Sequence, residues 1–174
     1  MNDIVRYQLR KPAAAKSESF WIVAVPVDTE LKKLVDGLHK VYKEKSPSID
    51  VDLHPQARFR GDTGDFLELA GNLLDNACKW AGNNVTILLE RLPDQLSPLI
   101  RICIEDDGPG LTEAERKRVM KRGVRLDERK PGSGLGLDIV QELAGIYGGR
   151  VELSESVTGG LRAVLLLPAA KNPQ

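Results

Sequence analysis

Apolar residues recur along most of the chain with two periods, one typical of amphipathic helices and one typical of half-buried strands. The helical period predicts four helices in the body of the chain, over about 28–41, 62–80, 112–119 and 135–147. The two-residue period predicts five strands, at 49–53, 85–91, 99–105, 150–154 and 161–167. We expect Asp28 or Thr29 to cap the first helix and Asp62 or Thr63 the second, because short polar side chains satisfy the free amide groups of a helix start.

The order of these elements indicates the fold class. Neighbouring strands are mostly joined as hairpins, and the helices can all lie on one face of the sheet. This combination predicts a two-layer α/β sandwich with a mixed sheet, and it argues against a doubly wound parallel sheet.

The two ends of the chain differ from its body. Residues 1–11 place apolar side chains along one side of a short helix, which Pro12 breaks. We therefore expect residues 1–11 to be the end of a longer helix and 12–27 to be a linker. The folded domain is then expected over 28–168, followed by a tail at 169–174.

The composition limits which binding partners and which cellular compartment are expected for this chain. The chain has 174 residues, enough for one hydrophobic core, and 25 Lys and Arg balance 25 Asp and Glu. A net charge of zero removes the usual electrostatic argument for a nucleic acid or an anionic membrane as partner. The longest apolar run, Phe20–Val25, is too short to span a bilayer. Cys78 and Cys103 lack metal-like spacing, so both are interpreted as small buried thiols of a reduced, intracellular domain.

The helix predicted over 62–80 carries polar residues on one face. Glu68, Asn72 and Asn76 are four residues apart, and Lys79 and Trp80 continue that face. Asparagine oxygens can ligate a Mg²⁺ ion that keeps several waters and takes its other ligands from a triphosphate. Lys79 would add a charge for phosphate, and Trp80 a flat surface for a base. Taken alone, the segment also fits an ordinary solvated helix face.

Two glycine-containing segments follow. The first, 105–110, comes directly after a strand, so its backbone can approach a ligand while Asp106 accepts from an exocyclic amine such as that of adenine. The second, 131–136, opens the last helix and aims backbone N–H groups at an anion. It has no Walker lysine and follows no strand, which excludes the P-loop and Rossmann motifs. An Asp-Gly turn and a glycine hinge are the simpler alternatives.

The stretch 113–130 between these segments is cationic. It holds eight Lys and Arg residues against four Asp and Glu residues. A cationic loop bounded by glycines suits a mobile lid over a polyphosphate, although a run of charge is more often solvated surface.

In this order, the three segments resemble the N, G1 and G2 boxes of the histidine-kinase ATP-binding domain, a member of the GHKL or Bergerat-fold ATPase superfamily. The segment 158–168 resembles that family's last glycine turn and strand, so the resemblance covers about residues 28–168. Within the family, the motifs look closest to PhoQ-type sensor kinases. The resemblance implies the Bergerat fold with a mobile ATP lid, and ATP and Mg²⁺ as cofactors.

The resemblance also implies roles for individual residues. Asn76 matches the principal Mg²⁺-binding asparagine, and Asn72 matches the residue one turn earlier that contacts metal or phosphate. Lys79 matches the phosphate-contacting lysine, and both Lys79 and Asn72 are expected to act in catalysis. Trp80 sits where an aromatic side chain stacks near adenine, and Asp106 matches the aspartate that reads the adenine amine. The other implied nucleotide-binding residues are Gly108, Gly110, Arg122, Lys130, Gly132, Gly134, Leu135 and Gly136.

The sequence departs from the family pattern in two places. Met120 stands where the F box usually has phenylalanine, and an unbranched methionine can fill the same apolar socket. Neither His39 nor His54 has the sequence context of a phosphoacceptor histidine. We therefore expect the acceptor on a dimerisation helix of the intact protein.

The activity that the resemblance implies is transfer of the γ-phosphoryl group from ATP to that histidine, for relay to an aspartate of a response regulator. The alternatives are a GHKL ATPase that hydrolyses ATP to drive a conformational change, and a nucleotide-binding pseudo-kinase. Those hydrolases carry a glutamate base at the position of Asn72, and an amide cannot accept a proton at neutral pH. Glu68 would supply the base only if the motif were shifted by one helical turn.

The resemblance further implies where the domain acts and with what. We expect a monomeric, cytoplasmic fragment of a homodimeric receptor in the bacterial inner membrane. Its partners would be ATP, the dimerisation and phosphoacceptor domain, and a response regulator, and not a nucleic acid.

Overall fold

A computed structural model describes residues 24–92, 97–121 and 136–170. The expected helix at 1–11, most of the expected linker at 12–27 and most of the expected tail at 169–174 lie outside these residues. So do residues 122–130 of the expected lid at 113–130 and residues 131–135 of the glycine-containing segment that follows it.

Eleven elements are assigned in the described part of the chain. The helices are α2 (Val27–Val41), α3 (Thr63–Trp80), α4 (Glu113–Val119) and α5 (Gly136–Ile146). The strands are β1 (Ala24–Pro26), β2 (Ser48–Leu53), β3 (Arg58–Arg60), β4 (Asn84–Leu92), β5 (Leu99–Asp106), β6 (Arg150–Glu155) and β7 (Leu161–Pro168).

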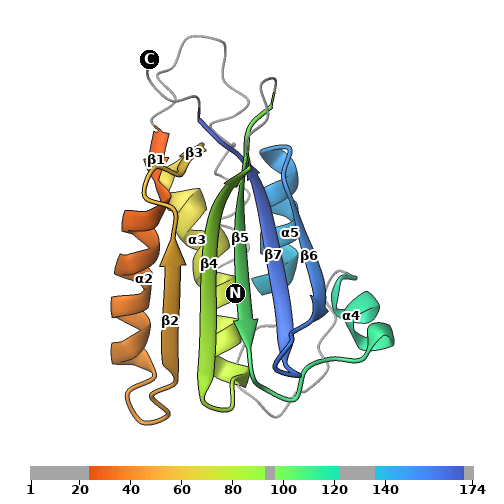
Figure 1. The fold of residues 1–174 in the computed structure, drawn as a ribbon. Helices are drawn as coiled ribbons and strands as arrows, with labels where there is room; N and C mark the ends of the chain where they lie inside the picture. The colour runs from red at the N-terminus through yellow and green to blue at the C-terminus, as the bar shows by residue number, and fades with distance from the viewer. Residues whose placement is uncertain (1–23, 93–96, 122–135, 171–174) are drawn as a thin grey trace, which may run out of the picture.

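Five strands form one mixed sheet in the order β2-β4-β5-β7-β6 (Figure 1). β2 pairs with β4 in parallel, and the other three pairings are antiparallel. Helices α2, α3 and α5 pack on one face of this sheet, whereas α4 lies beside the edge strand β6. The predicted fold class, a two-layer α/β sandwich with a mixed sheet and helices on one face, is confirmed.

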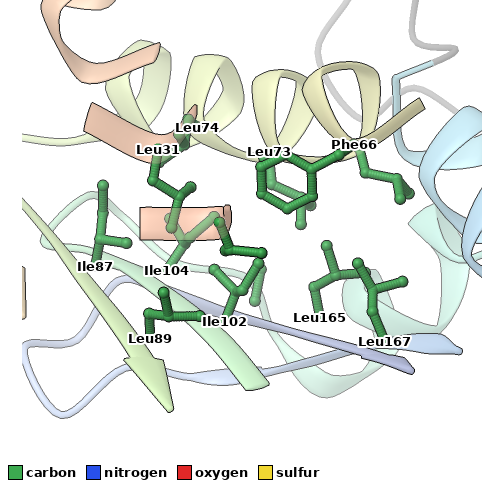
Figure 2. Close-up of a cluster of buried hydrophobic side chains, with 14 of the residues drawn as sticks. Leu31, Phe66, Leu73, Leu74, Ile87, Leu89, Ile102, Ile104, Leu165 and Leu167 are labelled. Carbon is green, nitrogen blue, oxygen red and sulfur yellow. The ribbon is translucent and has the colours of Figure 1, made fainter. Parts of the chain in front are cut away.

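The core lies between the helices and the sheet, and it follows the periods read from the sequence. Figure 2 shows Leu73, Leu74 and Phe66 of α3 facing apolar residues of the strands. The strands contribute every second residue, and these side chains are at most 2% exposed: Ile87 and Leu89 in β4, Ile100, Ile102 and Ile104 in β5, and Leu165 and Leu167 in β7. Cys78 and Cys103 are buried free thiols, as predicted.

A short two-stranded sheet, β1 with β3, was not expected from the sequence. Its strands have three residues each, which is too short for a two-residue period to stand out. The pair continues into the end of the chain, because Phe59 bridges to Ala169. Val25 and Ala169, which lie just outside the expected domain of 28–168, are buried together with Phe59 and belong to the core.

Helix starts agree with the prediction in one case and not in another. The Asp62 side chain accepts from the backbone N–H of Asp65 and caps α3, as expected. The expected cap of α2 by Asp28 or Thr29 is wrong, since the helix already begins at Val27 with no side-chain cap. The reason is that β1 runs directly into α2, and the N–H of Val27 donates to the carbonyl of Ala57 at 3.2 Å.

Candidate functional site

The last three turns of α3 carry the polar face singled out in the sequence. The opposite face of the helix is apolar and buried, with Leu73, Ala77 and Cys78 packed into the core, so the polar residues are turned away from it. The Asn76 side chain is exposed, and its Oδ1 accepts a 3.1 Å hydrogen bond from Nε1 of Trp80. The two predicted binding residues therefore contact each other on one face, one turn apart.

Asn72 is held by its own helix and by the start of α5. Its Nδ2 donates to the carbonyl of Glu68 at 2.7 Å, which commits the amide nitrogen to the helix backbone. A Cβ added to Gly136 would lie 2.7 Å from Oδ1 of Asn72, so the backbone of α5 passes directly over this oxygen. Predicted residues from the first and third segments are thus brought into contact, and glycine at 136 permits it.

Asp106, the last residue of β5, is the next predicted residue of the site. Its side chain is almost fully buried, and Oδ1 accepts from the N–H groups of Gly108 at 2.9 Å and Leu161 at 3.3 Å. Burial raises the pKa of this carboxyl, and the two backbone donors oppose that rise. Both of these hydrogen bonds end on Oδ1 of Asp106 and not on Oδ2.

The backbone around Asp106 is packed too closely for most side chains. A Cβ at Gly108 would lie 2.4 Å from the carbonyl oxygen of Trp80, so the loop after β5 rests on the end of α3. Gly110 has a positive φ of 65°, and its Cβ would meet the carbonyl of Gly159 at 2.6 Å. These contacts place both predicted glycines of the second segment between α3 and the β6–β7 turn.

Lysine side chains lie at the end of α3. Nζ of Lys79 is 5.4 Å from the ring centroid of Trp80, which is a cation–π distance. Nζ of Lys45 donates to the carbonyls of Cys78 at 2.9 Å and Lys79 at 2.8 Å, two of the groups that a helix end leaves without a helical partner. Lys45 thereby stabilises the turn that carries Lys79 and Trp80.

Sequence reasoning missed several residues that shape this site. Lys45 reaches α3 from more than thirty positions away, and nothing in the local sequence signals that contact. Gly160 was noted only as part of a turn, yet its Cβ would lie 2.0 Å from the carbonyl of Asp106. Thr158 Oγ1 donates to the same carbonyl at 3.1 Å. The Thr158-Gly159-Gly160 triplet was the available signal for the last two residues.

Five predicted nucleotide-binding residues fall outside the described part of the chain: Arg122, Lys130, Gly132, Gly134 and Leu135. Met120 is described, and its partly buried side chain packs against the core.

The donor set fits Mg²⁺ better than a metal held by the protein alone. Among the described residues, no group of three or more His, Cys, Asp or Glu side chains could hold a metal ion. The amide oxygens of Asn72 and Asn76 are neutral, hard donors, which suit a Mg²⁺ ion that keeps waters and phosphate ligands. A carbonyl oxygen has two lone pairs, so Oδ1 of Asn76 can ligate an ion while it accepts from Trp80.

Comparison with known proteins gives consistent results. The family model described as "Histidine kinase-, DNA gyrase B-, and HSP90-like ATPase" matches residues 61–171. The virulence sensor histidine kinase PhoQ of Salmonella typhimurium (strain 14028s) is 40% identical over 137 residues, which are 79% of this chain and 27% of that protein. The chain therefore spans about a quarter of the length of this curated relative.

Two solved structures of similar sequence share the fold. The mycobacterial sensor histidine kinase MprB is 28% identical with a TM-score of 0.66, over 80% of this chain and 94% of that one. The ATP binding domain of PrrB from Mycobacterium tuberculosis is 28% identical with a TM-score of 0.63, over 86% and 98% of the two chains. In the described part of this chain, no helix is both long and apolar enough to cross a membrane.

Proposed function

The chain belongs to the family of histidine kinase-, DNA gyrase B- and HSP90-like ATPases and is homologous to PhoQ and other sensor histidine kinases, and on this premise we propose that it binds ATP with Mg²⁺ and transfers the γ-phosphoryl group to a histidine. The acceptor histidine lies on the dimerisation domain of the intact receptor. An aspartate of a response regulator then takes the phosphoryl group.

The observation that carries this proposal is the placement of Asp106 beside the end of α3. A buried carboxylate with two backbone donors on Oδ1 offers Oδ2 to the exocyclic amine of adenine. The carbonyl of Trp80 lies against Gly108 of the same loop, so a purine held by Asp106 reaches the Trp80 side of α3. Base recognition and the polar face of α3 then belong to one site.

Asn76 and Asn72 lie one and two turns before Trp80, towards the phosphates of a nucleotide held in this way. Asn76, together with Asn72 one turn earlier, would hold Mg²⁺. The ion would neutralise part of the negative charge of the β- and γ-phosphates. Lys79 adds a positive charge on the same face. Arg122 and Lys130 are proposed to reach the phosphates, and Gly108, Gly110, Gly132, Gly134, Leu135 and Gly136 to shape the pocket and its lid. As in other phosphoryl transfers, positioning and charge stabilisation then account for most of the catalysis.

Transfer to histidine is favoured over hydrolysis by the residue at position 72. Hydrolysis of ATP requires a base that takes a proton from water, and the Asn72 amide cannot act as one. Its nitrogen is moreover bound to the helix backbone. A neutral imidazole already carries a nucleophilic lone pair, so a histidine acceptor needs no base at this position.

The proposal extends to the intact protein. The parent is a homodimeric receptor of the bacterial inner membrane with this domain in the cytoplasm, as its relationship to PhoQ suggests. The isolated chain is monomeric and lacks a nucleic-acid partner.

Asp106→Asn tests the adenine role without disturbing the loop. The amide keeps Oδ1 for Gly108 and Leu161, but it replaces the acceptor Oδ2 with a donor that faces the adenine amine. ATP affinity measured by titration calorimetry is expected to fall by at least about tenfold, with the melting temperature unchanged or higher. Asp52→Asn, at an exposed position of the edge strand β2, is the matched control and leaves the affinity unchanged.

Labelled ATP tests the reaction itself. The chain is incubated with ATP, Mg²⁺ and a purified two-helix dimerisation domain that contains its histidine. Acid-labile labelling of that histidine is expected. Phosphate release without labelling would contradict the proposal and favour the hydrolase, and nucleotide binding with neither product would favour the pseudo-kinase.

A further inference from the structure

Asp107 follows Asp106 in the chain, but its carboxylate turns to a different part of the fold. Oδ1 accepts from three consecutive backbone N–H groups, those of Gly82 at 2.8 Å, Asn83 at 2.9 Å and Asn84 at 2.9 Å. Oδ2 accepts from Nδ2 of Asn84 at 3.0 Å. A single side chain thus binds three consecutive N–H groups where α3 leads into β4.

These donors account for the acidity of Asp107. Hydrogen bonds from the backbone of Asn84 and Asn83, with help from the Asn84 side chain, lower the pKa of its carboxyl to about 2. The carboxylate is therefore ionised, and accepting, at any physiological pH.

Backbone contacts join the same two segments on either side of this carboxylate. The N–H of Asp107 donates to the carbonyl of Asn84 at 3.2 Å. A Cβ at Gly82 would lie 3.3 Å from the carbonyl of Asp107, and one at Gly108 would lie 2.4 Å from the carbonyl of Trp80. The loop 106–110 and the connection 81–84 are consequently in close backbone contact.

We propose that Asp107 is a positioning residue for nucleotide binding, which fixes the adenine-reading carboxylate of Asp106 relative to the end of α3. This inference rests on the proposed function, because it concerns the same site. Asp107 touches neither nucleotide nor metal. It acts through the backbone, by setting how far the loop that carries Asp106 lies from the turn that carries Trp80.

The two carboxylate oxygens of Asp107 differ in how much of the backbone connection they hold. The three backbone donors converge on Oδ1, and an asparagine retains that oxygen. Asp107→Asn therefore keeps the oxygen that accepts all three backbone bonds, and it loses Oδ2, which accepts from the Asn84 side chain and, at 3.2 Å, from the N–H of Asn83. Asp107→Ala loses both.

The test compares ATP with GTP as probes on the wild-type chain and its variants. Guanine presents a carbonyl where adenine has its amine, so a correctly placed Asp106 carboxylate favours ATP. We expect Asp107→Ala to weaken ATP binding by about tenfold and to weaken GTP binding much less, so that the preference for ATP falls. Asp107→Asn is expected to stay within about threefold of wild type for both nucleotides.

Tyr147→Phe is the control for general destabilisation. The Tyr147 hydroxyl donates to Oδ2 of Asp65 at 2.5 Å, at the opposite end of α3. Its removal lowers the melting temperature but leaves the ATP-to-GTP preference at the wild-type value. All affinities are measured at a temperature at which circular dichroism shows each variant to be folded.

Each outcome is decisive. If Asp107→Ala binds ATP within about twofold of wild type, or if it lowers both affinities equally as general destabilisation would, the positioning role is wrong. If Asp107→Ala does not fold, Asp107→Ser is measured instead, since one hydroxyl cannot serve three donors, and the same loss of preference is expected. If the wild-type chain itself fails to bind ATP, the proposed function fails, and this inference with it.

Discussion

At the scale of single residues, Asp106 and Asp107 are neighbours with opposite electrostatic surroundings. Burial raises the pKa of Asp106, while converging N–H groups lower the pKa of Asp107 to about 2. The charge of the Asp106 carboxylate is disfavoured by burial, and a hydrogen bond from the amine of a ligand would offset that cost. The Asp107 carboxylate already accepts its hydrogen bonds from the protein. Their surroundings match the two roles assigned above, one for binding and one for positioning.

This contrast predicts a dependence of stability on pH. The folded-state pKa of Asp107 lies below its unfolded value of about 3.9, so its contribution is complete above that value and is lost as the pH falls through about 2. In urea unfolding experiments, the stability difference between wild type and Asp107→Ala should be constant from about pH 5 to 7 and shrink below about pH 4.

Asp106→Asn provides the opposite control for that experiment. Because the pKa of Asp106 is raised in the folded state, protonation of Asp106 favours folding. The wild type should therefore gain stability relative to Asp106→Asn as the pH falls.

The Asp107 prediction has its own contrary outcome. If the stability difference between wild type and Asp107→Ala stays constant down to pH 3, the assigned pKa of Asp107 is wrong.

Site residues that lie together in one stretch of sequence were predictable. Residues that reach the site from a distant segment were not. Asn72, Asn76 and Trp80 share a helix face, and helical spacing alone places them together. Leu161 is fifty-five positions from Asp106 and serves it through a backbone N–H, which any residue type other than proline would provide. The side chain at such a position carries no signal, so only the folded chain identifies it.

At the scale of elements, long periodic segments were predicted well and short ones were not. The helix over 62–80 and the strands over 85–91 and 99–105 were found within one or two residues of their predicted bounds. β1 and β3 escaped prediction, because three residues give no period and their pairing joins distant segments. The start of α2 was misplaced for the same reason, since Ala57 rather than a local side chain satisfies its first amide.

The start of α3 gives a prediction at this scale. Asp62→Ala removes the acceptor for the N–H of Asp65 and should lower the free energy of unfolding by about 1 kcal/mol, as read from urea denaturation. Asp62→Asn keeps an acceptor and should cost only a few tenths of that.

Thr29→Ala is the informative control for that measurement. Thr29 is exposed, and α2 has no side-chain cap, so this variant should stay within about 0.5 kcal/mol of wild type. A loss at Thr29 equal to the loss at Asp62 would mean that α2 does begin at the position first expected from the sequence.

At the scale of the whole molecule, one core connects α2, α3 and α5 with the main sheet and the β1–β3 pair. Leu31 of α2, Leu74 of α3 and Ile87 of β4 meet in this core, and Phe59 of β3 belongs to the same cluster (Figure 2). Damage at any point of a single core lowers the stability of the entire unit. We therefore expect the described domain to unfold in one cooperative transition.

Leu74→Ala tests this expectation. Leu74 is fully buried, so the variant should lose about 2–5 kcal/mol of unfolding free energy while circular dichroism and tryptophan fluorescence still report one shared transition. Val41→Ala, at a valine that is 73% exposed, should change the stability by less than about 0.5 kcal/mol. Separate transitions for the two signals would show that the core consists of independent parts.

The position of β7 in the sheet has a consequence for synthesis of the protein. β7 comes after the other strands in the chain, yet it lies inside the sheet, between β5 and β6. A nascent chain that has not yet released residues 161–168 from the ribosome has no strand to which β6 can be joined. It also lacks the Leu161 amide that holds Asp106. The sheet and the candidate site are therefore both incomplete until this segment has emerged, and before then the edge of β5 that pairs with β7 is open.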